Sequence, residues 1–280
     1  MSEDRSDRNS VFGSIPQVST ARTDMGNDIP LEIVPLPSGG KVYSVDSPLH
    51  GRETLEIKPM TAREEDILTS RALIKKGTVI NELVKSCVAD KGIDVSDLIL
   101  GDRAALMVAI RITGYGPEYN GELTCTSCDE KFSHTFRLDD LPIKTLDIKP
   151  VEEGKNEFPF VLPLSKRTVH FKFLTGHDEA DITVTSENKK KKNLKGDIDD
   201  LVTSRLNYSV VAVDGLKSKA DIVKFVNNMR AMDARALREY MDEKEPGMEM
   251  RQVADCPHCG HSEEVTVPMG ANFFWPSTRR

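Results

Sequence analysis

The chain has 280 residues, of which 38% are hydrophobic and 30% charged. This is the balance of a soluble globular protein, with length for one large or two medium domains. The net charge of −7 argues against a protein whose main task is to grip phosphate backbones. No apolar run approaches the roughly 20 residues of a membrane helix, and the N-terminus lacks the apolar core of a signal peptide, so we expect neither membrane insertion nor export.

The first elements can be predicted from local patterns. Residues 1–28 are polar and without periodicity, which predicts a flexible arm. Short strands and turns lead to Thr61, which forms a capping-box spacing with Glu64 and starts a helix that Gly77 should stop. The next helix carries Cys87 on its apolar face, and we expect this thiol to be a small buried hydrophobe.

A third helix is expected to be capped by Asp102 and to end near Gly114. The stretch "GELTCTSCDEKFSHTFRL" then alternates polar and apolar residues, as two strands joined by a cysteine knuckle would. From Pro142 to Leu164 the chain is proline-rich and predicts an extended region.

The remaining elements follow the same order. Residues 165–175 alternate, and a helical run begins at residue 176. We expect the lysine-rich stretch "NKKKKNLKGD" to interrupt that helix as a solvated loop, and two or three helices to follow between residues 199 and 241. The stretch "EMRQVADCPHCGHSEEVTVPM" is again strand, knuckle and strand.

This order of elements suggests an internal repeat. Thr175 aligns with Thr61 (175 − 61 = 114), and Arg205 in "DLVTSRL" aligns with Arg71 in "DILTSRA" (205 − 71 = 134). The difference between the two offsets is roughly the length of the lysine-rich loop. A third block aligns without a gap at an offset of 131 and pairs Asp233 with Asp102, Ala236 with Ala105, Leu237 with Leu106, Gly247 with Gly116, Cys256 with Cys125 and Cys259 with Cys128.

The sequence therefore predicts an α+β fold built from two duplicated helix-plus-β-hairpin units that a four-cysteine, zinc-ribbon-like site joins. The first repeat would span residues 29–141 and the second residues 142–280. The alternative is that two similar units match by chance.

Four of the five cysteines form two Cys-x-x-Cys pairs, Cys125 with Cys128 and Cys256 with Cys259. Such a pattern favours metal over disulfides in a chain that is not exported. One pair supplies two thiolates, whereas a structural zinc needs four ligands in a tetrahedron. Two facing knuckles would complete this set, so we predict one structural zinc ion bound by all four cysteines.

Two other readings of the cysteines remain open. A tetrahedral thiolate cage also suits iron. "CPHC" also occurs as a disulfide-exchange motif, but that motif normally lies at a helix N-terminus, whereas the residues that follow it here are typical of a strand.

No catalytic constellation is recognisable, and a four-cysteine site has no open position to activate water. We therefore predict that the protein is not an enzyme and has no small-molecule substrate. A zinc-ribbon regulator that binds nucleic acid is the alternative. The acidic strands around Cys256, with Glu249, Asp255, Glu263 and Glu264, argue against it.

The stretches "TAREEDILTSRALIKKGT", "GDRAALMVAIRITGYG", "CPHCG" and "MGANFFWPS" resemble the baseplate hub assembly proteins of T-even-type contractile-tailed bacteriophages. The resemblance covers about residues 30–276. It implies a non-enzymatic role in building the tail baseplate hub, with other hub or tail proteins as partners. The expected location is the host cell cytoplasm during assembly and, if the protein stays, the baseplate of the virion.

The tail ends in three adjacent aromatic residues, Phe273, Phe274 and Trp275. They are candidate partner contacts because aromatic side chains are preferred at interface hot spots. The alternative is that they fold back over the cysteine hairpins.

Overall fold

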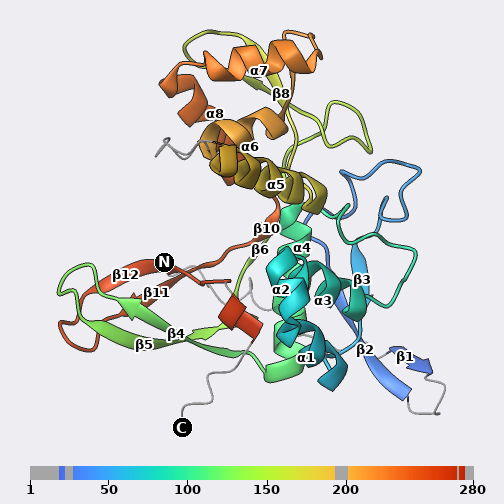
Figure 1. Cartoon of the computed structure of the whole chain (residues 1–280), viewed down its shortest axis with the longest axis vertical. Helices are drawn as coiled ribbons and strands as arrows, with labels where there is room; N and C mark the ends of the chain where they lie inside the picture. The colour runs from blue at the N-terminus through green and yellow to red at the C-terminus, as the bar shows by residue number, and fades with distance from the viewer. Residues whose placement is uncertain (1–18, 23–27, 193–200, 270, 275–280) are drawn as a thin grey trace, which may run out of the picture.

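A computed structural model of the chain describes residues 19–22, 28–192, 201–269 and 271–274. Helices and small antiparallel sheets are mixed, so the α+β class is confirmed. In Figure 1 the helices α1 to α4 pack beside strands β1 to β3, helices α5 to α8 form a second body above them, and two β-hairpins project together to one side. Within the described residues no helix is long and apolar enough to cross a membrane.

The first half of the chain forms a three-stranded sheet, four helices and the first hairpin. The pairing order of the sheet is β1-β2-β3, and the hairpin consists of β4 and β5. The elements are β1 (Ser19–Arg22), β2 (Asp28–Pro35), β3 (Thr54–Ile57), α1 (Ala62–Thr69), α2 (Arg71–Lys76), α3 (Val79–Cys87), α4 (Leu100–Tyr115), β4 (Glu118–Thr124), β5 (Lys131–Arg137) and η2 (Leu138–Asp140).

The second half has the sheet β7-β8-β9, four helices and the hairpin of β11 and β12. A short pairing of β6 with β10 joins the link between the halves to the segment after α8. The elements are β6 (Ile143–Lys144), β7 (Phe158–Val161), β8 (Thr168–Phe171), α5 (Gly176–Lys192), α6 (Leu201–Ser209), β9 (Val210–Val213), α7 (Lys219–Asn227), α8 (Ala231–Lys244), β10 (Gly247–Met248), β11 (Arg251–Asp255), β12 (Ser262–Thr266) and η3 (Ala271–Phe274).

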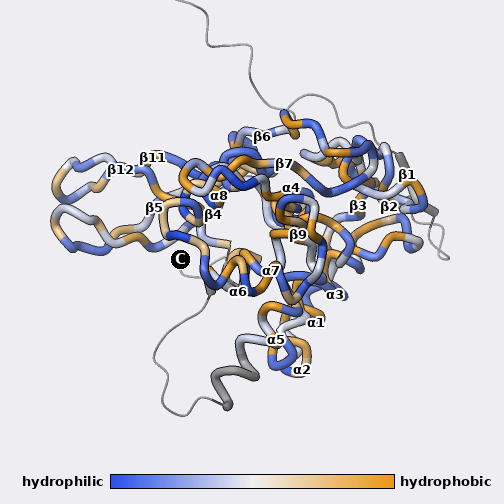
Figure 2. Tube along the Cα trace, turned by 90° about the horizontal axis from the view of Figure 1, so that it is seen from above, coloured by the Kyte–Doolittle hydropathy of each residue, from blue (hydrophilic) through white to orange (hydrophobic). Residues whose placement is uncertain are grey.

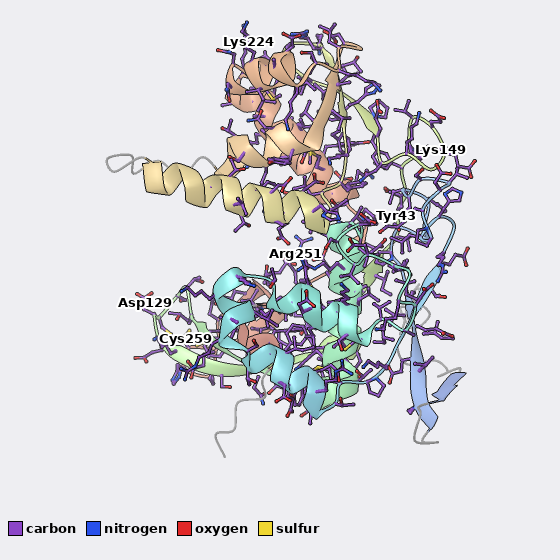
Figure 3. The ribbon with its side chains drawn as sticks, turned by 45° about the vertical axis from the view of Figure 1, so that its right-hand side comes forward. Tyr43, Asp129, Lys149, Lys224, Arg251 and Cys259 are labelled. Carbon is purple, nitrogen blue, oxygen red and sulfur yellow. The ribbon has the colours of Figure 1, made fainter. Side chains whose placement is uncertain are left out.

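One hydrophobic core runs through both halves. It includes Leu106 of α4 and Leu237 of α8, both fully buried, together with aromatic rings from the sheet β7-β8-β9 and from the hairpin bases. The hairpins project beyond this core, as the view from above shows (Figure 2), and they carry a small cluster of their own. Asp129 and Cys259 both lie at the far end of the hairpin pair (Figure 3).

Several sequence predictions need correction. Four residues of the predicted flexible arm, Ser19–Arg22, form strand β1 and pair with β2; residues 1–18 and 23–27 lie outside the described residues. The predicted first helix breaks at Ser70 into α1 and α2, although Gly77 ends α2 as expected. Helix α5 continues through the expected loop as far as Lys192, and residues 193–200 are not among those described. Strand β9 was not predicted.

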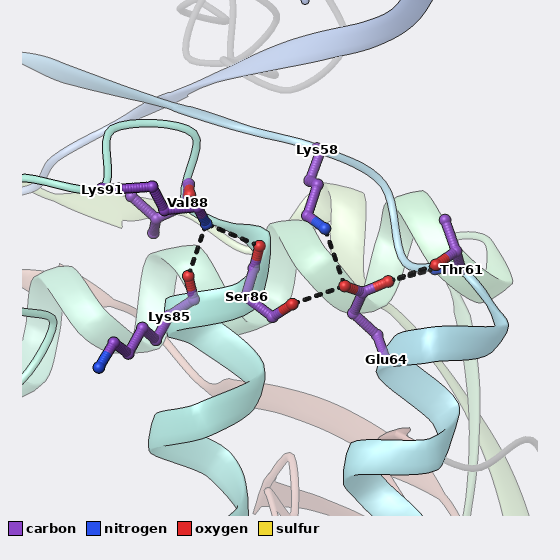
Figure 4. Close-up of polar contacts among 7 residues, drawn as sticks. All are labelled: Lys58, Thr61, Glu64, Lys85, Ser86, Val88 and Lys91. Atoms are coloured by element: carbon purple, nitrogen blue, oxygen red, sulfur yellow. Dashed lines mark hydrogen bonds and ion pairs between the residues drawn. The ribbon is translucent and has the colours of Figure 1, made fainter. Parts of the chain in front are cut away.

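Glu64 of α1 is a fully buried carboxylate that accepts four hydrogen bonds from three residues of the first half (Figure 4). It accepts hydrogen bonds from the backbone N–H and the hydroxyl of Thr61 at 3.0 and 2.5 Å, which confirms the predicted capping box. The ammonium group of Lys58 and the hydroxyl of Ser86 donate to its other oxygen at 2.9 and 2.6 Å. Burial alone would raise the pKa of Glu64, but these donors outweigh it and lower the pKa to about 2.

The second half repeats this arrangement at the start of α5. Asp178 accepts hydrogen bonds from the N–H and the hydroxyl of Thr175, both at 3.0 Å, and from the ammonium group of Lys172 at 2.8 Å. The lysine, threonine and carboxylate therefore recur at the same mutual spacing as in the first half.

Two further carboxylates, both buried, hold the loop between β2 and β3 and the loop between β7 and β8. Asp102 does not cap α4, whose N-cap is Ile99, so that prediction was wrong. It lies in the first turn and accepts hydrogen bonds from Ser38 N–H at 2.8 Å and from the hydroxyl of Tyr43 at 2.5 Å. Burial raises its pKa. Asp233, in the first turn of α8, accepts from the N–H groups of Leu164 and Ser165 at 2.8 and 3.1 Å.

We predict that Glu64→Gln lowers the free energy of unfolding by about 2–3 kcal/mol at neutral pH, because the amide cannot satisfy four donors inside the fold. The folded pKa lies near 2 and the ordinary value is 4.5, so the carboxylate stabilises the fold above about pH 4.5 and loses this effect as the pH falls through 2. Urea unfolding at several pH values should show a flatter acid limb in the variant. Asp66→Asn, on the same helix and exposed, is the control and should change neither quantity.

Candidate metal centre

The two cysteine knuckles have the same backbone geometry. Cys125 follows β4 directly and Cys256 follows β11 directly. Each knuckle then closes with a hydrogen bond to the carbonyl of its first cysteine, from Asp129 N–H at 3.0 Å and from Gly260 N–H at 2.9 Å. Asp129 and Gly260 both have positive φ, 58° and 71°, a conformation that glycine adopts at no cost and aspartate tolerates.

These turns bring all four sulfur atoms together. The four Sγ atoms lie within 4.8 Å of one another. Two of these distances run between the hairpins, 3.7 Å from Cys125 to Cys259 and 3.8 Å from Cys128 to Cys256. Sulfurs at the corners of a tetrahedron, about 2.3 Å from a zinc ion, lie about 3.8 Å apart. The spacing therefore fits four ligands around one ion, and it is far longer than a disulfide bond of about 2.05 Å.

The cluster lies half inside the protein. Cys125 and Cys256 are buried, Cys128 is half-buried and Cys259 is exposed. Around them lies a small apolar cluster of Phe132, Ala254, Leu123 and Val265. One side of the site is therefore dry, while its outer edge is open to solvent for an ion to enter.

Without metal, the two thiols of the first knuckle hold their protons unequally. Burial favours the neutral form of Cys125, but N–H groups of Cys128 and Ser127 directed at its sulfur lower its pKa to about 7. The backbone N–H of Glu130 favours ionisation of Cys128, yet burial and the three neighbouring thiols raise its pKa to about 12. A divalent cation would stabilise all four thiolates, and its binding would release protons.

The donor set is that of a coordinatively closed site. Four thiolates fill a tetrahedral zinc or iron centre and leave no position for water or substrate. The knuckles lead into strands β5 and β12 and not into helices. The cysteines therefore lack the helix N-terminus that activates the thiol of a disulfide-exchange motif.

The sequence matches a known family over most of its length. A family model described as T4 bacteriophage base plate protein matches residues 31–275. The chain belongs to this baseplate protein family. No curated protein and no solved structure matches it.

Membership in the baseplate family confirms the resemblance predicted from the sequence. Proteins of this family are generally structural, and within the described residues we recognise no arrangement of side chains that would carry out a reaction. A baseplate protein works in contact with other tail proteins, so the surfaces of the chain matter as much as its sulfur cluster.

The aromatic tail does not offer Phe273 and Phe274 to a partner. Both side chains are fully buried in the main core, and Phe273 contacts the ring of Tyr119 with centroids 5.3 Å apart. The partner-contact prediction is therefore wrong for these two residues, because their apolar surface is already used inside the chain. Trp275 lies outside the described residues.

Arg111 fixes this tail to the base of the first hairpin. Its guanidinium is buried and donates to three backbone carbonyls, those of Phe273 at 2.9 Å, Gly116 at 2.9 Å and Glu118 at 3.0 Å. Burial lowers the pKa of Arg111. No pattern in the sequence marks Arg111 as a structural residue, because its acceptors are backbone carbonyls, which every residue has.

We predict that the purified chain carries about one zinc ion and that Cys256→Ser releases it, because three thiolates and a hydroxyl hold the ion less well. Elemental analysis of the native protein measures this. Cys87→Ala is the matched control, since it removes the fifth, fully buried thiol and no ligand. Four freely titrated thiols in a metal-free native protein would show that the prediction is wrong.

A second prediction concerns the tail. Phe273→Ala should lower the free energy of unfolding by about 3–5 kcal/mol, the usual cost of truncating a buried phenylalanine. Urea unfolding measures the change. Pro268→Ala, at an exposed position between β12 and η3, is the control and should be close to neutral. An unchanged stability in Phe273→Ala would contradict the buried position of the ring.

Proposed function

We propose that this protein is a non-enzymatic component or assembly factor of the phage tail baseplate hub. It acts through contacts with other hub or tail proteins, and a structural zinc ion joins its two halves. The observation that carries this proposal is the family match over residues 31–275. The closed four-thiolate geometry supports the structural role of the metal.

We also propose that the chain arose by duplication, with a first repeat at 29–141 and a second at 142–280. The best support is the block at offset 131. Leu100 and Ala231 both begin a helix, Lys131 and Ser262 both begin the second strand of a hairpin, and the knuckle residues with positive φ differ by the same 131 (260 − 129).

The sheets support the same relation. In β2–β3 Pro35 pairs with Thr54, and in β7–β8 Val161 pairs with Thr168. Both sheets then receive the chain directly after a helix: Ile57 bridges to Val88 after α3, and Phe171 pairs with Val210 after α6. Helix α6 is thus the counterpart of α3. The alignment of Arg205 with Arg71 is therefore wrong, because Arg71 begins α2 and Arg205 lies within α6.

The alternative role, a zinc-ribbon regulator that binds nucleic acid, is not favoured. Exposed acidic residues surround the hairpin ends, among them Asp129, Glu130, Asp255 and Glu264. Negative side chains there would repel phosphates.

The protein would work in the cytoplasm of the infected host cell during assembly and, if it stays in the particle, in the virion baseplate. Affinity purification from infected cells tests this role. We expect hub or tail proteins to co-purify with the wild-type chain, and a chain that purifies without them would contradict the proposal.

Removal of the zinc site should weaken this association. We predict that the double variant Cys125→Ser/Cys256→Ser co-purifies with several-fold less hub protein, because the two hairpins lose their link and fluctuate independently. Cys87→Ala is again the matched control. Equal recovery of hub proteins with the double variant would separate the metal from the assembly role.

A further inference from the structure

The two halves differ in how far matching residues are exposed to solvent. Ser38 of the first half and Leu164 of the second occupy matching positions, since each donates its N–H to the buried aspartate in the last helix of its half, Asp102 of α4 or Asp233 of α8. Ser38 is 1% exposed, whereas Leu164 is 42% exposed. Gly101 and Met232 also correspond (232 − 101 = 131), and Gly101 is buried while Met232 is 63% exposed.

The second half itself covers this end of the first half. A Cβ atom placed on Gly101 would lie 1.6 Å from the carbonyl oxygen of Pro246 and 3.0 Å from the Cα of Gly247. Leu146, in the link between the halves, donates its N–H to the carbonyl of Pro37 at 3.1 Å. The start of α4 is therefore packed backbone to backbone against the segment that follows α8.

The matching contact, between the start of α8 and the segment after α4, is not made within the described residues. The start of α8 presents Met232, with Leu164 and Pro163 exposed beside it. The counterpart of Gly247 is Gly116 (247 − 116 = 131), and a Cβ atom built on Gly116 would meet no other atom within 4 Å. Met232 on the first surface and Glu118 on the second are exposed in the described part of the chain, while the buried Arg111 holds the second segment from inside through the carbonyls of Gly116 and Glu118.

We propose that the chain associates with a second copy of itself head to tail, the start of α8 in one copy against the Tyr115–Glu118 segment of the next. This inference rests on the correspondence between the two halves and not on the hub role. It places the Met232 side chain of one copy where the fold itself has only the backbone of Gly101, so the two copies would meet through side chains and not backbone to backbone.

The chemistry of the two surfaces is complementary. Met232, Leu164 and Pro163 offer apolar surface, and the facing segment offers the half-buried Tyr115 and Pro117. The exposed Arg230 and Lys166 border the first surface, whereas Glu118 and Glu65 border the second. Opposite charges at the rim would fix the orientation of the two copies.

Such a contact joins two different surfaces and is therefore heterologous. Heterologous contacts build closed rings when the rotation between neighbours closes, and open filaments when it does not. The contact leaves each copy with one free surface of each kind, so association continues beyond a dimer unless the ring closes.

Sedimentation velocity of the purified full-length chain at increasing concentration tests the proposal. We expect the mean mass to rise with concentration for the wild type and to stay that of a monomer for Met232→Glu. Val253→Glu is the matched control, since Val253 is 64% exposed on the outer face of β11, and it should behave as the wild type.

Reversing the charges on both surfaces tests whether the partner at the start of α8 is a second copy of the chain. Arg230→Glu should weaken association, and adding Glu118→Arg in the same chain should restore it. A wild-type chain that stays monomeric, or equal loss with Met232→Glu and Val253→Glu, would overturn the proposal. The proposal would also be overturned by a chain that never self-associates but binds a different baseplate protein at Met232. Co-purification with hub proteins could still succeed in each case, so the two proposals fail separately.

Discussion

A two-stranded hairpin has too little apolar surface to be stable alone in water, and this chain extends two of them beyond its main core. Their shared apolar cluster consists of a few side chains and the cysteines themselves. The hairpins therefore depend on a link between them. All four sulfurs lie within 4.8 Å of one another, and the two distances between the hairpins, 3.7 and 3.8 Å, are those of a tetrahedral thiolate site. The cysteines come from positions 131 apart in the chain, so a single ion bound by them would fix the two halves to each other.

The arrangement of sulfurs also shows how the halves are related locally. A rotation that places each hairpin on the other would map Cys125 onto Cys256 and Cys128 onto Cys259. It would therefore turn the Cys125–Cys259 contact into the Cys128–Cys256 contact, and the two distances are nearly equal. The hairpins thus face each other with approximate two-fold symmetry. The helices do not share this symmetry, because the start of α4 contacts the segment after α8 while the start of α8 is exposed. A single symmetric unit would bury both ends equally.

The parts of the fold that the sequence predicts are those with a local cause. The capping box of Thr61 and Glu64, the stop at Gly77 and both knuckles depend on residues within a few positions of one another. The interactions it does not reveal join distant residues. Ser86 reaches Glu64 across 22 positions, and Arg111 reaches the carbonyl of Phe273 across 162. Because backbone acceptors are the same for every residue, no side-chain pattern marks them.

The misaligned stretch around Arg205 has a similar origin. "DLVTSRL" and "DILTSRA" share letters, but one leads through α6 into β9 and the other spans the break between α1 and α2. Under the proposed duplication, strand pairing is the better guide to which segments correspond, because the register of β8 with β9 resembles the bridge of Ile57 to Val88. The same register explains why Leu164 and Met232 stand out. Under the proposed duplication they take the places of a buried serine and a buried glycine, and these exposed apolar side chains are what the proposed contact between copies would remove from water.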